Sequence, residues 1–150
     1  MVSALIWDAS LQSLTTIMTT ALDSLGATTI SAASTEVDNT TNLHTAFWLE
    51  LFTDTLAGTP TVDTTIDLYM TRQIDGTNYE TAPVTGGAQA QSKYLGSVFH
   101  AAATTARRTI LGPFPMDPIK YKFYVDNRLS AALAATANTL KIGSRSLEGQ

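Results

Sequence analysis

The chain has 150 residues, 44% of them hydrophobic and only 15% charged, and a formal net charge of −4. This length suits one domain with a real core, and the hydrophobic content excludes a compositionally disordered chain. The acidic balance, with Arg107-Arg108 as the only basic cluster, argues against nucleic-acid binding, and the lack of cysteine excludes disulfides and thiolate metal sites.

Residues 1–12 are predicted to form an N-terminal arm with an apolar patch, Leu5-Ile6-Trp7. The patch is too short for a signal peptide and lacks its basic n-region, and no run reaches the ~18 apolar residues of a membrane helix. We therefore expect synthesis in a cytoplasm and no membrane partner. Because Trp7 has no obvious core position, Leu5, Ile6 and Trp7 are the candidate partner-binding residues. The alternative is that the arm folds back onto its own sandwich.

Residues 11–25 fit either a helix or a strand. Leu11, Leu14, Met18, Leu22 and Leu25 have near-helical spacing, and Gly26 suits a helix end. The β-branched run of residues 15–20 opposes a helix, because such side chains lose rotamer freedom there. A strand over residues 14–20 is the favoured prediction.

Further strands are predicted over residues 28–35, 43–52 and 65–71, with a polar turn at 37–42. Residues 43–52 are apolar on both faces, which predicts a central strand covered on both sides. In residues 65–71 the apolar side chains Ile66, Leu68 and Met70 alternate with polar ones. Because successive side chains of a strand point to opposite faces, one face of this strand should be buried.

The segment Asp75-Gly76-Thr77-Asn78-Tyr79-Glu80 resembles part of a calcium-binding loop. The twelve-residue pattern of such a loop is missing, so a tight turn in which Asp75 and Asn78 cap backbone amides is the favoured interpretation. A low-complexity connection follows over residues 81–92, and loops of this length tend to be functional or mobile.

The second half of the chain predicts strands over residues 94–101, 109–111, 119–126 and 139–142. Residues 112–118 are predicted to be a proline turn that ends central pairing, and residues 129–136 fit either a helix or a turn. A flexible tail is expected over residues 144–150. Some eight short strands predict an all-β fold, a jelly-roll-like two-sheet β-sandwich over residues 13–143.

No catalytic, cofactor-binding or metal-binding residue is predicted, and no cofactor is expected. His44 and His100 lie outside any ligand-spaced motif, and the spacing of Asp54, Asp63, Asp67 and Glu80 supports no glycosidase pair. A sugar-binding platform would use strand aromatics, although core packing is their commoner role. These aromatics are Trp48, Tyr69, Tyr121, Phe123 and Tyr124. We expect a non-enzymatic protein and keep a carbohydrate-binding module as an alternative.

The order of the motifs over about residues 20–142 resembles small virion structural proteins of tailed bacteriophages. The motifs are the polar turn 37–42 before the apolar strand 46–51, the turn 75–79, the Gly112-Pro113-Phe114 turn, and Asn127 before residues 131–136. The arrangement resembles in particular the β-sandwich capsid decoration (cement) proteins of these virions. The resemblance implies a homotrimer on the outer capsid surface, bound to the major capsid protein lattice. A tail or fibre component is the alternative within the virion.

Self-association is also predicted from the residues themselves. Sheet edges that carry little charge, such as residues 28–35, invite pairing with other chains. The arm of residues 1–12 is therefore expected to make contacts outside its own sandwich in a homo-oligomer.

Overall fold

The computed structural model describes residues 5–7, 13–61, 64–84, 91–100 and 103–149, and within these ranges the chain forms strands and no helix. One sheet, here called the β5 sheet, contains β2 (Thr15–Met18), β10 (Thr139–Arg145), β5 (Ala46–Thr53) and β8 (Arg107–Pro115) in that order. The other, the β6 sheet, has β9 (Lys120–Asn127) next to β6 (Thr65–Arg72), and β7 (Lys93–Phe99) beyond it. The short strands β3 (Thr29–Ile30) and β4 (Val37–Asp38) both pair with β9.

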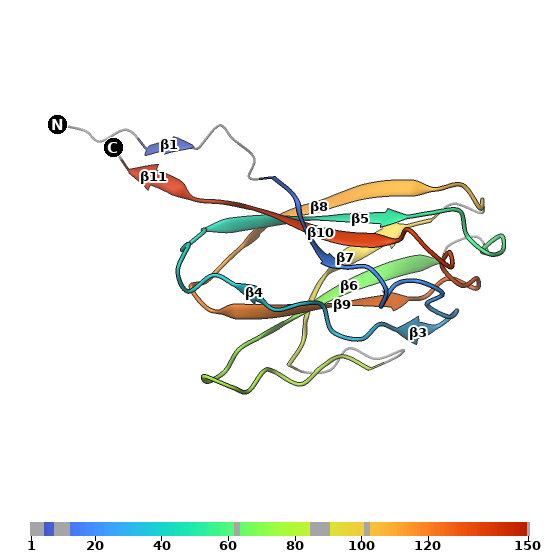
Figure 1. The fold of residues 1–150 in the computed structure, drawn as a ribbon, viewed down its shortest axis with the longest axis horizontal. Coiled ribbons are helices and arrows are strands. Elements are labelled where there is room, and N and C mark those ends of the chain that lie inside the picture. The colour runs from blue at the N-terminus through green and yellow to red at the C-terminus, as the bar shows by residue number, and fades with distance from the viewer. Residues whose placement is uncertain (1–4, 8–12, 62–63, 85–90, 101–102, 150) are drawn as a thin grey trace.

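The two sheets lie face to face, as Figure 1 shows, so the predicted two-sheet β-sandwich is confirmed. The strands pair as a nested series of antiparallel partners: β6 with β7, β5 with β8, β3 and β4 with β9, and β2 with β10. Successive pairs fall alternately in the two sheets. A long hairpin rolled up in this way is the jelly-roll arrangement. The outermost pair, β1 (Leu5–Trp7) with β11 (Leu147–Gly149), forms a separate two-stranded ladder.

The core lies between the sheets, and period-two alternation explains which residues enter it. Ile66, Leu68 and Met70 are buried as predicted, and the inward residues of β5 meet those of β9. The Phe47 ring centroid lies 5.2 Å from that of Phe114 and 5.5 Å from that of Phe123. These aromatic contacts join the two sheets at one end of the core.

Three fully buried asparagines, Asn39, Asn127 and Asn138, hold the loops at the ends of the sandwich. The Asn127 side-chain amide donates hydrogen bonds to the carbonyl oxygens of Leu25, Gly26 and Ala131 at 3.0–3.1 Å, and its Oδ1 accepts one from the Leu129 amide. The side-chain amides of Asn39 and Asn138 likewise each donate to one nearby and one distant loop carbonyl. Buried side-chain amides therefore fix the loops that these three asparagines contact.

The predicted strand over residues 28–35 is shorter in the structure, because only Thr29–Ile30 forms regular pairs. Beyond it, the hydroxyls of Ser31 and Ser34 accept hydrogen bonds from the backbone amides of Val125 and Phe123, both at 3.0 Å. Side-chain oxygens thus partly replace the backbone partners that a longer strand would give β9.

The prediction that residues 112–118 form a turn is wrong over its first part. Strand β8 continues through Gly112 and Pro113 to Pro115. It can do so because β8 is at the edge of the β5 sheet, where the missing proline amide donors are not needed for pairing on both sides. Gly112 has a φ of +118°, and a Cβ there would lie 2.9 Å from the Phe47 carbonyl oxygen, so this position requires glycine.

Other boundaries differ from the sequence predictions by a few residues. Residues 15–18 form the favoured strand and are followed by turns, so the helical alternative for 11–25 is wrong where the chain is described. Residues 129–136 are neither helix nor strand. Strand β10 runs to Arg145, and β11 begins at Leu147, within the segment predicted to be a flexible tail. The middle of the 81–92 connection, residues 85–90, lies outside the described residues.

Candidate interaction surface

The outward side of the β5 sheet carries apolar and basic side chains together. Because Phe47, Leu49 and Leu51 point into the core, the alternate β5 residues point outward. Strand pairing places residues of β8 and β10 beside them. We call this surface the Trp48 face; its members are Trp48, Glu50, Phe52, Arg108, Ile110, Pro113, Pro115, Lys141 and Arg145.

The prediction that β5 is covered on both sides is only half fulfilled. The strand is central in its sheet, between β10 and β8, and its inward residues are fully buried. On the outward side, Trp48 and Phe52 are only half-buried. This side is therefore a partly exposed aromatic surface.

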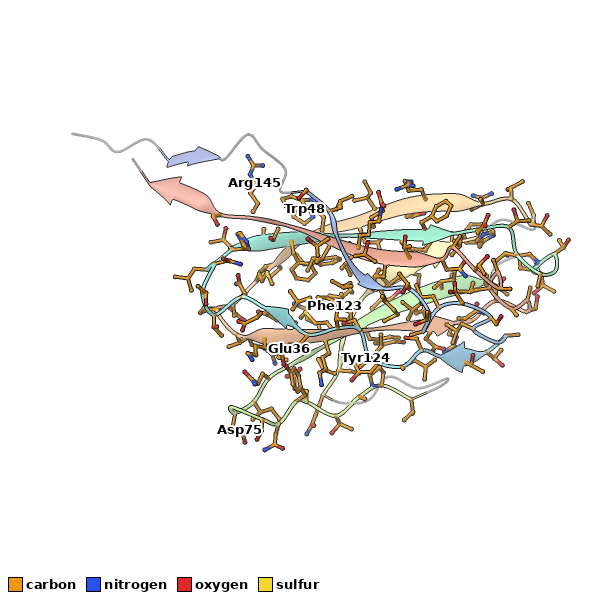
Figure 2. The ribbon with its side chains drawn as sticks, in the orientation of Figure 1. Glu36, Trp48, Asp75, Phe123, Tyr124 and Arg145 are labelled. Carbon is orange, nitrogen blue, oxygen red and sulfur yellow. The ribbon has the colours of Figure 1, made fainter. Side chains whose placement is uncertain are left out.

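A shallow hollow of about 600 Å³ lies at one end of the Trp48 face. It is lined by Ala46, Trp48, Pro113, Phe114, Pro115 and Arg145. The register of β5 against β8 shifts between Phe47 and Leu49, opposite Gly112 and Pro113, which places the proline ring beside the indole. In Figure 2, Trp48 and Arg145 both lie on the side of the β5 sheet that faces away from Phe123. The hollow is thus an outward apolar site with a cation at its rim.

The charges of the Trp48 face are arranged around one carboxylate. Glu50 Oε1 lies 2.5 Å from Nη1 of Arg108 and 3.7 Å from Nζ of Lys141, and the Glu50 side chain is only 5% exposed. The Arg108 guanidinium also stacks over the Phe52 ring at 5.1 Å. With Arg145, the described residues of the face carry three cations and one anion. Its net charge of +2 contrasts with the net charge of −4 of the whole chain.

The predicted partner-binding residues Leu5, Ile6 and Trp7 form β1, whose backbone pairs with β11. Their side chains, and residues 1–4 and 8–12 of the predicted arm, lie outside the described residues. Figure 1 shows the β1–β11 ladder extending beyond one end of the sandwich. The ladder follows directly from β10, the strand that carries Arg145, so it adjoins the Trp48 face. The sequence analysis did not predict β11, because a strand of three residues is too short to show a clear alternation of apolar and polar side chains.

The structure separates most of the carboxylates that sequence reasoning considered together. Asp67 lies near the start of β6, whereas Glu80 binds Arg72 at its end, at 2.6 Å. Asp67 and Arg72 are five residues apart on the strand, so Asp67 and the Glu80 bound at Arg72 lie about 16 Å apart. Asp54 follows β5 in the other sheet, and Asp63 lies outside the described residues. Within the described part of the chain, no three His, Asp or Glu side chains gather as metal ligands would.

The two histidines also lie apart from each other. His44 Nδ1 is 2.9 Å from the Ser146 hydroxyl, near the end of β10, and His100 is fully buried after β7. The His44–Ser146 pair places a hydroxyl next to a base, but within the described residues no Asp or Glu hydrogen-bonds the His44 ring as the third member of a catalytic triad would.

The five strand aromatics do not form one platform. Tyr121 and Phe123 are buried between the sheets. Tyr69 and Tyr124 pair across strands on the outward side of the β6 sheet, the opposite surface of the molecule from Trp48. Because the aromatics are divided among three layers, a flat sugar-binding surface made from all of them is absent from the described residues.

The turn at residues 75–79 is built as predicted. Asp75 Oδ1 accepts hydrogen bonds from the backbone amides of Thr77 and Asn78 at 3.0 and 2.9 Å, and the Asn78 side-chain amide binds both carboxylate oxygens. The hydrogen bonds from Asn78 and then Thr77 lower the pKa of Asp75 to about 2. The carboxylate thus acts as the cap of a tight turn, the favoured alternative to a calcium ligand.

Replacing Asp75 with alanine should speed hydrogen exchange at the Thr77 and Asn78 amides, because both lose their acceptor. In the wild-type protein the same loss should occur on acidification. The folded pKa lies below the unfolded value near 3.8, so the stabilisation is complete above pH 4 and is lost as the pH falls through about 2. An NMR titration of the Asp75 carboxyl checks this; a midpoint near 4 would contradict it.

Comparison of the chain with protein-family models, with curated proteins and with solved structures found no match. The described residues include no helix of the length and apolarity needed to cross a bilayer.

Proposed function

We propose that the protein is a non-enzymatic virion structural protein that decorates and stabilises a bacteriophage capsid by binding the lattice of the major capsid protein. The observation that carries the proposal is the Trp48 face, a partly exposed aromatic and basic surface on the outward side of the four-stranded β5 sheet. Aromatic and arginine side chains are enriched at protein interfaces. The jelly roll itself occurs in capsid proteins as well as in lectins, so it is compatible with this function without selecting it.

The low charge of the chain supports the same proposal. Only 15% of the residues are charged, well below the roughly 25% of typical soluble domains. A surface with few charges has a small desolvation cost when it packs against neighbouring subunits. In the proposed assembly the protein is a homotrimer, and the arm of residues 1–12 together with the β1–β11 ladder contacts neighbouring chains.

The test is to mix the purified protein with undecorated capsid shells. We expect stoichiometric co-sedimentation and a higher melting temperature of the shell in calorimetry, because a ligand that binds only the assembled state stabilises it. Labelled copies should cover the shell, whereas copies at a single vertex would indicate a tail component. Failure to bind any shell would contradict the proposal.

A variant that lacks residues 1–12 serves as the comparison in this assay. It removes β1 and leaves β11 without its described partner, but it leaves every strand of the two main sheets in place. The β-sheet circular dichroism should therefore be unchanged, while the trimer, measured by light scattering, or the attachment to the shell should weaken. An unfolded variant, or one that assembles and binds normally, would contradict the role given to the arm.

A further inference from the structure

We infer that the Trp48 face is the docking site of this protein, and that its partner presents carboxylates around a projecting apolar side chain. The inference deepens the proposed function and rests on it, because the binding assay uses the same shells. It assigns the contact to one of the two outer surfaces of the sandwich and states the chemistry of the surface that fits it.

Charge is the first argument. The Trp48 face carries a net charge of +2 within a chain of net charge −4, so the remainder of the chain carries −6. Arg108 and Lys141 share one buried carboxylate, that of Glu50, and Arg145 stands at the rim of the hollow. An interface of complementary potential therefore requires acidic groups on the partner.

A second copy of this chain fits that requirement poorly, because most of the carboxylates that the structure describes are already engaged within the fold. Glu36 binds Lys120 at 2.7 Å and also accepts a hydrogen bond from the Tyr79 hydroxyl. The Lys120 interaction and then the Tyr79 hydrogen bond hold the pKa of Glu36 below its usual value. Similar internal contacts involve Asp38 with Thr40, Asp67 with Ser97, Glu80 with Arg72, and Asp126 with Arg128.

The shape of the hollow is the second argument. The indole of Trp48 and the rings of Pro113 and Pro115 line a space of about 600 Å³, large enough for an aliphatic or aromatic side chain. Proline rings lose little conformational entropy when they are covered, and Trp48 lies on β5, one of the two inner strands of a four-stranded sheet. A site with this degree of preorganisation binds with little ordering cost. An apolar centre with a polar rim is also the usual anatomy of a protein interface.

The test measures shell binding by two variants of the Trp48 face. Trp48→Ala should weaken binding about thirtyfold, the loss typical of an aromatic hot spot. Arg145→Glu should weaken it about tenfold at low salt, and its difference from wild type should shrink at high salt because added ions screen the charge. Matched controls on the β6 sheet are Tyr124→Ala, a half-buried aromatic, and Lys93→Glu, an exposed strand cation. Both controls should bind as wild type does.

The outcomes separate this inference from the proposed function. If both Trp48-face variants bind the shells as tightly as the wild-type protein does, or if the β6-sheet controls lose binding, the inference is wrong and the proposed function stands. If the wild-type protein does not bind the shells, both the inference and the proposed function are wrong. If Trp48→Ala or Arg145→Glu remains folded but dissociates the oligomer, the face belongs to a contact between copies and the inference is wrong. Binding of duplex DNA that Arg145→Glu abolishes would overturn it in favour of a nucleic-acid partner. Circular dichroism and thermal melting of each variant establish that it is folded.

Discussion

Replacing Phe47 with alanine should lower the free energy of unfolding by about 4 kcal/mol. Phe47 is fully buried, and its ring meets Phe114 from β8 and both Tyr121 and Phe123 from β9. Deleting the ring removes apolar burial and leaves a cavity between rings that the paired strands hold in place, so the site can collapse only in part. Urea denaturation, followed by circular dichroism, measures the change.

The control for this prediction is Phe52→Ala on the same strand. Phe52 points outward, is half-buried, and has Arg108 stacked on its ring. Its loss should cost below about 1.5 kcal/mol, since little apolar area is buried there and the cation–π contact is exposed. Equal losses in the two variants would show that the aromatic cluster around Phe47 does not hold the sheets together.

Local patterns in the sequence predict much of the core. The alternation of Ile66, Leu68 and Met70 is a property of adjacent residues, and it identifies the buried face of β6 before any partner is known. The same holds for Tyr121, Phe123 and Val125 in β9. The capped turn after Asp75 is also local, since the hydrogen bonds that the Asp75 carboxylate accepts join residues within three positions of one another.

Features that depend on distant partners could not be predicted in this way. The prolines of β8 are compatible with a strand only because β8 lies at a sheet edge, and a single sequence does not give the order of strands. The β1–β11 ladder joins the two ends of the chain, and nothing in three residues at either end indicates the other.

The candidate site has the same limitation. The sequence identifies Trp48 as an aromatic residue on a predicted strand. Pro113 and Arg145 lie beside it only because β8 and β10 pair with β5 in particular registers. The outward direction of Trp48 follows from the burial of its alternating neighbours Phe47 and Leu49 in the core. The sequence therefore suggests the residue, and only the fold provides the surface around it.

The buried asparagine at the end of β9 gives a second large effect. Asn127→Asp should lower the free energy of unfolding at pH 7 by at least about 3 kcal/mol. The two side chains have nearly the same shape, so packing is preserved. The donor amide, which binds the carbonyl oxygens of Leu25, Gly26 and Ala131, is replaced by a carboxylate oxygen that those carbonyls repel. A matched surface change, Asn42→Asp, should alter stability by less than about 0.5 kcal/mol.

The pH dependence of Asn127→Asp distinguishes this electrostatic cause from a general disturbance of the loops. Burial among carbonyl oxygens raises the folded-state pKa of the new carboxyl above its unfolded value of about 3.9. The penalty should therefore be smallest below pH 4, where the protonated acid can donate one hydrogen bond to a carbonyl. Stability relative to the wild type should fall as the pH rises through the folded-state pKa and stay low above it. Urea denaturation of both proteins between pH 3 and pH 7 measures this difference. A penalty that does not change with pH would show that the loops tolerate the charge, and that Asn127 acts through its shape alone.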